Sequence, residues 1–386
     1  MSEVLALAQT QVQARDHLQE RVRAAAADHQ ALRIRGGGSK DFLGQSLQGE
    51  ILDTRALCGI TNYEPSELVV TVRAGTPLAE LEATLAEQGQ CLPFEPPRFM
   101  LTNAATHTAS QAAGGTVGGM VAAGLAGPAR AAVGGLRDYV LGATLLNGRA
   151  ELLSFGGQVM KNVAGYDVSR LLAGSMGVLG VICEVSLKVL PLAVATATLR
   201  FERDEGAALK QLNTWGGQPL PINASAWWDG MLVLRLSGAA AAVQSAVQRL
   251  GGERVDPTLA AAFWTGLRDQ TDEFFVKAGT AVAAGATLWR LAMPQTAAPM
   301  ALAGEHLVEW GGAQRWVVTT TPAAAVREAA ARAGGHATVF RCAQAGRAEG
   351  PRFAPLSAPL MQIHRELKTA FDPDRIFNPG RLYAGL

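Results

Sequence analysis

Cysteine is scarce in this sequence, and its four copies are scattered. Cys58, Cys91, Cys183 and Cys342 form no CxxC pair and no tight cluster. An iron–sulfur cluster normally takes four grouped thiolates, so this chain alone is not expected to hold one. The same spacing argues against a disulfide framework and favours a cytoplasmic protein.

The common nucleotide, metal and nucleophile motifs are also missing. The sequence has no GxxxxGK[ST] loop, and the glycines at 36–38 lack both the GxGxxG spacing and the acidic residue expected about 20 positions later. Its six histidines form no HExxH and no cluster with metal spacing, and GxSxG is absent. These absences argue against a P-loop enzyme, an ordinary nicotinamide dehydrogenase and a metal site.

Neither an excess of one charge nor a long apolar run is present. The formal net charge is +1, and no basic cluster is interleaved with aromatic residues, which argues against nucleic acid as a partner. The most membrane-like stretch, residues 112–127, contains six glycines and is too short to cross a bilayer. With 386 residues, 48% of them hydrophobic and 17% charged, the chain is expected to be globular and to hold more than one domain.

The first half of the sequence does carry an alternation of short strands, loops and helices. We expect strands over 31–36 and 68–75. A helix is predicted next, with Thr76 as its N-cap, Pro77 in its first position and Gly89 closing its end.

Two further strand regions complete this half. Residues 139–157 predict a β-hairpin, and the dipeptide Asn147-Gly148 within them favours a tight type I′ turn. Residues 178–191 predict a strand rich in β-branched residues that ends at Pro191.

The composition changes after residue 191. Alanine becomes common, and strands over 231–238, 287–294 and 314–322 alternate with alanine-rich helices, which predicts a separate α+β lobe. From about residue 351 an amphipathic helix precedes a tail rich in proline and glycine, which is expected to pack back on the body. The apolar face of this helix holds Leu360, Ile363, Leu367 and Phe371.

Three glycine-rich segments require close approach of the backbone: Gly36-Gly37-Gly38-Ser39, residues 114–119 and residues 165–180. Backbone N–H groups in such loops can converge on an anion, and a pyrophosphate makes the best use of such a surface. Taken singly, the first segment is more often a flexible turn than a phosphate site, and the second is more simply explained as a tightly packed helix crossing.

In chain order, these segments resemble the FAD-binding proteins of the vanillyl-alcohol oxidase/p-cresol methylhydroxylase (PCMH) type, and within them the family of the FAD-binding E subunit of bacterial glycolate oxidase. The matching cofactor stretches are IRGGGSKDFLG (34–44), ITNYEPSELVVTVRAGTPLAELEATLAEQGQCLPFEPP (60–97), GGTVGGMVAAGLAGPARAAVGGLRDYVLG (114–142) and FGGQVMKNVAGYDVSRLLAGSMGVLGVICEVSLKVLP (155–191). Beyond them LWRLAMP, EWGGAQRW, AGGHATVF, FAPLSAPL and FNPGRLYA match the pattern of that glycolate oxidase family more specifically.

The resemblance implies an α+β fold: a two-lobed PCMH-type FAD-binding domain (1–191), a smaller α+β cap lobe (192–345) and a C-terminal helix and tail returning to the FAD domain (346–386). It implies that FAD is the cofactor. The implied cofactor-binding residues are Gly36, Gly37, Gly38, Ser39, Lys40, Thr116, Gly118, Gly119, Ala123, Gly124, Asn162, Tyr166, Asp167, Val181, Ile182 and Asn378.

One segment departs from the family pattern. Residues 98–113 are longer than the link expected there, and they contain His107. Relatives that attach FAD covalently through histidine do so in other motif contexts, so His107 is interpreted as a surface residue and the FAD as noncovalent.

The resemblance implies an FAD-dependent oxidoreductase acting on CH–OH groups, as one subunit of a complex that oxidises glycolate to glyoxylate. The implied partners are a catalytic FAD-linked subunit and an iron–sulfur subunit that passes electrons to quinone, so the cytoplasmic chain would reach the inner membrane only peripherally, through its partners.

Two other interpretations stay open. The first is an autonomous dehydrogenase of the D-lactate type with its own 2-hydroxy-acid site, for which Arg290, Arg341 and His336 are the weak catalytic candidates, since a guanidinium can bind a carboxylate. The second is a flavin-bearing scaffold subunit. The absence of the histidine-rich HxGDGNxH segment of the related catalytic subunits favours the second for the substrate step.

Overall fold

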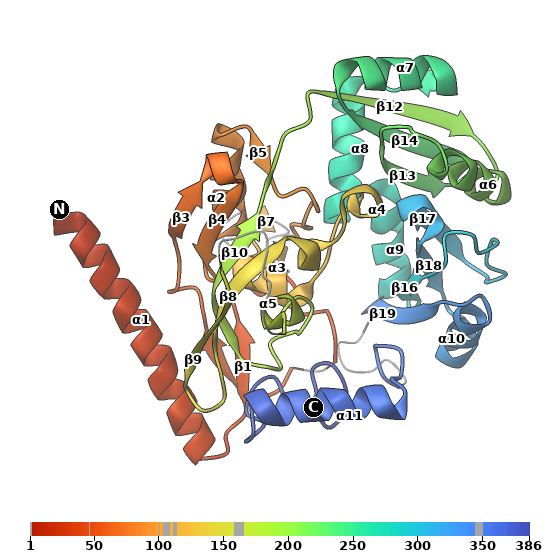
Figure 1. Cartoon of the computed structure of the whole chain (residues 1–386). Coiled ribbons are helices and arrows are strands. Elements are labelled where there is room, and N and C mark those ends of the chain that lie inside the picture. Colours follow the sequence, from red (N-terminus) through yellow and green to blue (C-terminus); the bar gives the residue numbers. More distant parts are fainter. Residues whose placement is uncertain are drawn as a thin grey trace.

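The computed structural model describes residues 2–45, 47–99, 101–102, 109–110, 114–157, 166–343 and 350–386. Within them the chain forms two lobes, each built around an antiparallel sheet, and a C-terminal helix that lies beside the first lobe (Figure 1). This confirms the predicted α+β class.

The first lobe contains a five-stranded antiparallel sheet in the order β3-β4-β10-β8-β9. Its strands are β3 (Ile60–Glu64), β4 (Val69–Arg73), β8 (Val140–Leu146), β9 (Leu152–Gly156) and β10 (Val181–Lys188). Side chains alternate between the two faces of a strand, and here each face carries buried apolar side chains. One face packs on α2 (Leu78–Glu87) and α3 (Val117–Ala123), and the other on α1 (Ser2–Ala27) and on the parallel pair β1 (Leu32–Arg35) and β2 (Glu50–Asp53).

Short elements complete the first lobe. They are the 3₁₀ turns Pro65–Glu67 and Leu136–Tyr139, the helices α4 (Arg130–Val133) and α5 (Val168–Leu171), and two small antiparallel pairs, β5 (Gln90–Cys91) with β11 (Leu190–Pro191) and β6 (Leu101–Thr102) with β7 (Ala109–Ser110).

The helix expected after residue 76 is α2. Its Leu78, Leu81 and Leu85 are buried on one face, and Gly89 has the left-handed conformation just past its end. Its predicted N-cap is wrong, because the helix begins at Leu78 with Pro77 in the cap position. The Thr76 hydroxyl donates instead to the Arg73 carbonyl at 2.8 Å and accepts from the Gly59 N–H at 2.9 Å. Thr76 therefore joins two loops rather than capping a helix.

The predicted hairpin is β8–β9, but its turn is not type I′. Residues 147–151 connect the strands, and the Asn147 side chain accepts from the N–H groups of Arg149 and Glu151 at 2.9 Å each. The positive φ falls at Ala150 (57°) and not at Gly148. A Cβ on Gly148 would lie 2.6 Å from Asp372, so this glycine is required by the packing of the C-terminal segment.

The second lobe contains an eight-stranded antiparallel sheet in the order β15-β12-β14-β13-β17-β18-β16-β19. Its strands are β12 (Ala195–Glu202), β13 (Ile222–Trp228), β14 (Met231–Gly238), β15 (Glu253–Arg254), β16 (Thr287–Ala292), β17 (Glu305–Glu309), β18 (Gln314–Thr319) and β19 (His336–Cys342). The 3₁₀ turn Trp310–Gly312 joins β17 to β18.

Helices cover both faces of this sheet. One face packs on α6 (Glu205–Gly216), α7 (Ala240–Leu250) and α10 (Ala323–Arg332). The other packs on α8 (Pro257–Asp269) and α9 (Glu273–Ala283) and also contacts the first lobe through Leu43, Phe99 and Leu125. This second face forms the junction between the lobes and is called the junction face below.

The C-terminal helix α11 (Ala358–Phe371) is fixed to the first lobe by a buried lysine. Lys368 Nζ donates to the carbonyls of Val178 (2.8 Å) and Phe377 (2.7 Å) and to the Asp372 carboxylate (2.7 Å). Of its predicted apolar face, Leu367 and Phe371 pack on the lobe, whereas Leu360 and Ile363 are about half exposed. In the part of the chain that is described, no helix combines the length and apolarity needed to cross a membrane.

Candidate functional site

Two of the predicted glycine segments meet at a cavity of about 550 Å³ in the first lobe, which is called the cradle below. The loop after β1 lies directly against the segment that leads into α3. A Cβ on Gly36 would lie 2.3 Å from the Thr116 hydroxyl, and one on Gly37 would lie 2.0 Å from the Gly114 carbonyl oxygen. No side chain larger than hydrogen fits at either glycine, which is the physical reason for the glycine run.

The cradle is electropositive. Lys40 lines it, and burial lowers the pKa of this lysine to about 8 although Asp269 opposes the shift. Its ammonium lies 3.5 Å from the Ser39 hydroxyl and makes no ion pair with a described carboxylate. Asp41, also at the cradle, is held by Arg33 and Arg35 at 2.7 and 2.8 Å.

The C-terminal tail closes one side of the cradle. Asn378 accepts from the Ile34 N–H at 2.8 Å and donates to the Met176 carbonyl at 2.7 Å, so it joins β1 to the segment before β10. Arg381 is buried beside it and donates to the Asp41 carbonyl at 3.0 Å. Asn378 is a predicted site residue and Arg381 is not, although both lie in the family-matching stretch FNPGRLYA (377–384) of the tail that is predicted to return to the FAD domain.

The structure brings most, but not all, of the predicted cofactor residues to this cavity. Those lining it are Gly36, Gly37, Gly38, Ser39, Lys40, Thr116, Gly119, Ala123 and Asn378. Gly118 packs on Ala74, where a Cβ would lie 2.6 Å from the Ala74 side chain, and Gly124 ends α3 with a φ of 62° against Gly174.

The remaining predicted residues lie elsewhere. Val181 and Ile182 are buried in β10 with their side chains in the apolar cores of opposite faces. Tyr166 is 97% exposed, and Asp167 caps α5 by accepting from the Arg170 N–H at 3.2 Å. Asn162 and His107 lie outside the described residues.

A second, smaller cavity lies between the lobes. Leu125, Ala126 and Gly127, which directly follow α3, line this cavity. Thr116, Gly119 and Ala123, at the start of α3 and within it, line the cradle. The two cavities therefore share one stretch of backbone. The inter-lobe cavity takes its other walls from the junction face and α8.

Arg290 on β16 is the cation of the inter-lobe cavity. Its side chain lies on the junction face, because its neighbours in sequence, Trp289 and Leu291, face α10. Burial, with the charge of Arg130, lowers its pKa to about 10, so it stays protonated at neutral pH. Among the described residues it has no hydrogen bond and no ion pair.

The other two candidates for substrate chemistry are placed differently. The Arg341 guanidinium lies 3.8 Å from the centre of the Phe42 ring and donates to the Gln270 side chain at 3.1 Å. It is therefore partnered beside the cavity and does not line it. His336 is exposed at the start of β19, where burial and the charge of Arg290 still lower its pKa.

An acid that is not among the predicted site residues lies in the same cavity, at the start of the stretch EWGGAQRW (309–316). Glu309, at the end of β17, is 4% exposed. Its Oε2 accepts from the Trp316 indole N–H at 2.6 Å and from the Gln314 amide at 2.9 Å, both on the neighbouring strand β18. The sequence contains no pattern around Glu309 that fixes which face of the sheet it occupies.

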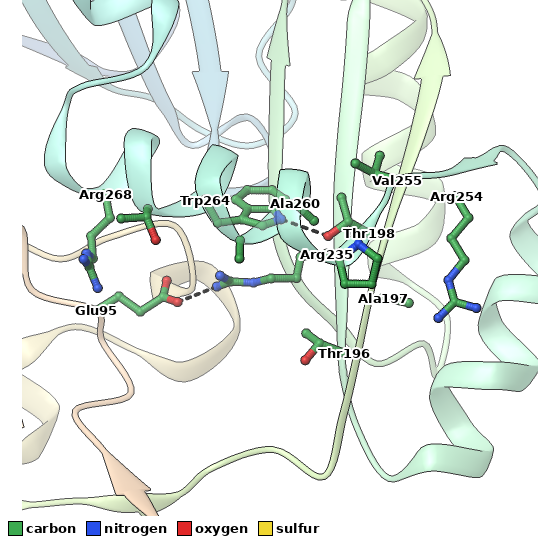
Figure 2. Close-up of a pocket in the computed structure, with 13 residues that line it drawn as sticks. Glu95, Thr196, Ala197, Thr198, Arg235, Arg254, Val255, Ala260, Trp264 and Arg268 are labelled. Atoms are coloured by element: carbon green, nitrogen blue, oxygen red, sulfur yellow. Dashed lines mark hydrogen bonds and ion pairs between the residues drawn. The ribbon is translucent and has the colours of Figure 1, made fainter. Parts of the chain in front are cut away.

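A third cavity, of about 830 Å³, lies between α8 and the strands β12 and β14. Figure 2 shows its inner end, where Arg235 reaches from the second lobe to Glu95 of the first at 2.7 Å. The Arg235 guanidinium lies 5.0 Å from the centre of the Trp264 ring, and the indole N–H of that tryptophan donates to the Thr198 hydroxyl at 3.0 Å.

An α+β fold with two lobes, a glycine-lined electropositive cradle in the first and a closed junction beside it defines an FAD-binding oxidoreductase of the PCMH type. The profile of the FAD binding domain family matches residues 7–156. The chain is 46% identical over 369 residues to glycolate oxidase subunit GlcE of Escherichia coli K12, which covers 96% of this chain and 97% of that protein.

Two more distant comparisons agree with this. The chain is 24% identical over 193 residues to glycolate oxidase subunit GlcD of Bacillus subtilis 168, covering 49% of this chain and 38% of that protein. Solved alkyldihydroxyacetonephosphate synthase superposes with a TM-score of 0.61 at 14% identity, over 94% of this chain and 74% of that one, which is a likeness of fold. The chain belongs to the GlcE family of FAD-binding glycolate oxidase subunits.

The cradle fits the FAD that the family implies. The glycines at 36 and 37 let the loop after β1 lie directly against the segment before α3, and Lys40 offers a cation that makes no ion pair with a described carboxylate. The Ser39 and Thr116 hydroxyls line the same cavity as hydrogen-bond donors. FAD, when bound, supplies the two-electron acceptor, and the protein supplies binding, orientation and exclusion of water.

Proposed function

We propose that this chain is the FAD-binding subunit of a glycolate oxidase complex, and that its own inter-lobe cavity takes the carboxylate of a short 2-hydroxy acid. The complex would oxidise glycolate to glyoxylate. The observation that carries the proposal is Arg290, a cation in the inter-lobe cavity that lies 5.8 Å from the centre of the Phe340 ring and has no hydrogen bond or ion pair with a described residue.

A buried charge without a partner is costly, so an unpaired guanidinium in a cavity favours an anionic ligand there. A guanidinium also matches a carboxylate in geometry, because its parallel N–H groups can donate to both oxygens.

The walls of the cavity would keep water out during the reaction. Phe99, Trp316 and Phe340 line it, and their rings pack edge to face, with Trp316 and Phe340 centroids 4.8 Å apart. Exclusion of water strengthens the attraction between Arg290 and a carboxylate, because the local dielectric constant falls.

The proposal includes partners and an organisation that follow from the family. A catalytic FAD-linked subunit and an iron–sulfur subunit would complete the complex, and electrons would pass through the latter to quinone at the inner membrane. Residues 1–191 would form the noncovalent FAD-binding domain, 192–345 the cap, and 346–386 a tail on the FAD domain.

Calorimetric titration of the FAD-loaded chain with oxalate tests the acid site, because oxalate carries the carboxylates but no hydrogen to oxidise. We expect R290A to weaken oxalate binding by about 10- to 100-fold, the loss of one charged hydrogen-bonded pair. R332A is the matched control, since Arg332 is exposed and pairs only with Glu328 at 2.6 Å. Equal affinity in wild type and R290A would contradict the site.

Anaerobic single-turnover mixing with glycolate and with D-lactate then tests the reaction. We expect glycolate to bleach the flavin absorbance of the wild-type chain, and R290A to lose this bleaching. A chain that binds oxalate but leaves its flavin oxidised would instead be the scaffold or electron-relay subunit, for which the missing HxGDGNxH segment argues.

A further inference from the structure

The inter-lobe cavity holds one acid and one unpaired cation, and they come from strands two positions apart in the sheet. Glu309 ends β17 and Arg290 lies in β16, with β18 between them. Alternation along each strand places both side chains on the junction face, together with Trp316 and Leu307. The two groups therefore line the same small space.

The carboxyl group of Glu309 is held in a fixed orientation. Both described hydrogen bonds go to Oε2, from the Trp316 indole and the Gln314 amide. Oε1 accepts no hydrogen bond from a described residue. One oxygen is thus anchored, and the other is left for a group in the cavity.

The surroundings make proton exchange at this carboxyl easy near neutral pH. Burial raises the pKa of Glu309 to about 7, the hydrogen bonds from Trp316 and Gln314 oppose the rise, and the charges of Asp272 and Glu95 add to it. The cations in reach are few, since Arg268 at the cavity wall is paired with Asp269 at 2.7 Å. Arg290 is left as the unpaired one.

We propose that Glu309 is the proton-exchanging group of this cavity, taking the hydroxyl proton of a short 2-hydroxy acid whose carboxylate Arg290 holds. This rests on the proposed function. The hydroxyl O–H bond breaks and its proton goes to Glu309. The α C–H bond breaks, the hydrogen leaves with its electron pair to the oxidised flavin, and the carbon–oxygen double bond of a 2-oxo acid forms.

Oxalate binding tests the assignment without turnover. A dianion held by Arg290 repels ionised Glu309, so binding requires a proton on that carboxyl. In the FAD-loaded wild-type chain we expect oxalate affinity to fall about tenfold per pH unit above pH 7, and titration in buffers of different ionisation enthalpy to show proton uptake of about one per oxalate. In E309Q, which keeps the oxygen acceptor for both donors, affinity and proton uptake should no longer depend on pH.

The rate of flavin reduction by glycolate gives a second readout. We expect the wild-type rate to rise with pH through about 7, because the ionised carboxylate is the base, and E309Q to be slower by about 10²–10⁴-fold with a flat profile. E82Q is the matched control. Burial also raises the pKa of Glu82, but this side chain pairs with Arg98 at a distance of 2.6 Å and does not line the cavity. E82Q should keep both wild-type profiles.

If E309Q does not fold, W316F serves instead. Loss of the indole donor should shift the midpoint of the oxalate pH dependence upward, because that hydrogen bond favours the ionised carboxylate. An oxalate affinity that varies with pH equally in wild type and E309Q, or a midpoint unmoved in W316F, would overturn the role of Glu309. Unchanged oxalate affinity in R290A would instead overturn the proposed acid site, and with it the role of Glu309 that rests on that site.

Discussion

Gly37 is the residue at which the requirement for glycine is most acute, because a Cβ there would lie 2.0 Å from the Gly114 carbonyl oxygen. We expect G37A to push the two cradle loops apart and G37D also to place a charge in the cradle, so both should lose FAD. The measurement is the flavin absorbance that remains with the purified protein, followed by titration with added FAD.

The matched control for this change is G216A. Gly216 is the last residue of α6, and a Cβ there would meet no atom within 4 Å. G216A should keep its flavin. Full retention of FAD by G37A would contradict the assignment of the cradle as the cofactor site.

At the scale of residues, the sequence predicts local backbone constraints better than it predicts the roles of side chains that depend on the tertiary fold. Three adjacent glycines indicate a backbone constraint without any knowledge of the fold, and the cradle supplies its physical cause. Glu309 and Arg381 lie in the family-matching stretches EWGGAQRW and FNPGRLYA, but no local pattern assigns them a role, because their importance depends on which face of a sheet, or which distant loop, they reach. Such residues become visible only once the register and the course of the tail are known.

The C-terminal helix ends in a buried ion pair, Lys368 with Asp372, in which both side chains are at most 1% exposed. Burial lowers the pKa of Lys368, and Asp372 opposes this by favouring the charged form. We expect K368M to lower the free energy of unfolding by about 3–5 kcal/mol, because it leaves the Asp372 carboxylate buried without its cation. Urea denaturation measures the loss.

A surface pair provides the comparison. Arg332 and Glu328 lie 2.6 Å apart on α10 with both side chains about two-thirds exposed, so R332A should cost at most about 0.5 kcal/mol. If K368M were no more costly than R332A, the buried pair would not be what fixes α11 to the first lobe.

The N-cap of α9 predicts a dependence of stability on pH. The Asp272 carboxylate accepts from the Phe275 N–H at 3.2 Å, yet burial raises its pKa from 3.8 to about 6. The folded state therefore binds more protons than the unfolded state between these values, and stability falls as pH rises through them. D272N keeps the capping oxygen and removes the charge, so its stability relative to wild type should be about 2 kcal/mol greater at pH 7.5 than at pH 3.5.

Urea denaturation of both proteins at the two pH values checks this. The same difference in unfolding free energy at pH 3.5 and pH 7.5 would show that burial does not penalise the Asp272 charge.

At the scale of elements, the sequence predicts that a helix or hairpin exists better than it predicts the cap or turn at its end. Local periodicity and turn residues locate α2 and the β8–β9 hairpin, since these signals lie within each segment. The cap at Thr76 and the turn at Asn147-Gly148 are wrong because tertiary partners decide both. Thr76 bonds the loop at Gly59, and Gly148 makes room for Asp372.

The two lobes act as one body because they share an apolar core and several polar links. Leu43, Phe99 and Leu125 of the first lobe pack in the same core as the junction face of the second. The Trp310 indole N–H donates to the Gly127 carbonyl at 3.0 Å, and the Arg98 N–H donates to Asp269 at 2.9 Å. These contacts join residues more than a hundred positions apart, so local sequence patterns could not predict how the lobes meet.

The pair Glu95–Arg235 offers the sharpest test of this unity, because it joins the lobes directly at 2.7 Å with side chains only 26% and 12% exposed (Figure 2). Glu95 also accepts from the Ala129 N–H at 2.8 Å, and Arg235 also donates to the Asn223 side chain at 2.6 Å, so both ends of the pair are held in place.

In a double-mutant cycle of E95Q and R235Q we expect a coupling energy of about 1–2 kcal/mol in the unfolding of the whole chain. Calorimetry should show a single transition that each single variant moves to lower temperature. Two separate wild-type transitions, or additive effects of the two changes, would mean that the lobes fold independently and that the closed junction around Arg290 is not maintained by this contact.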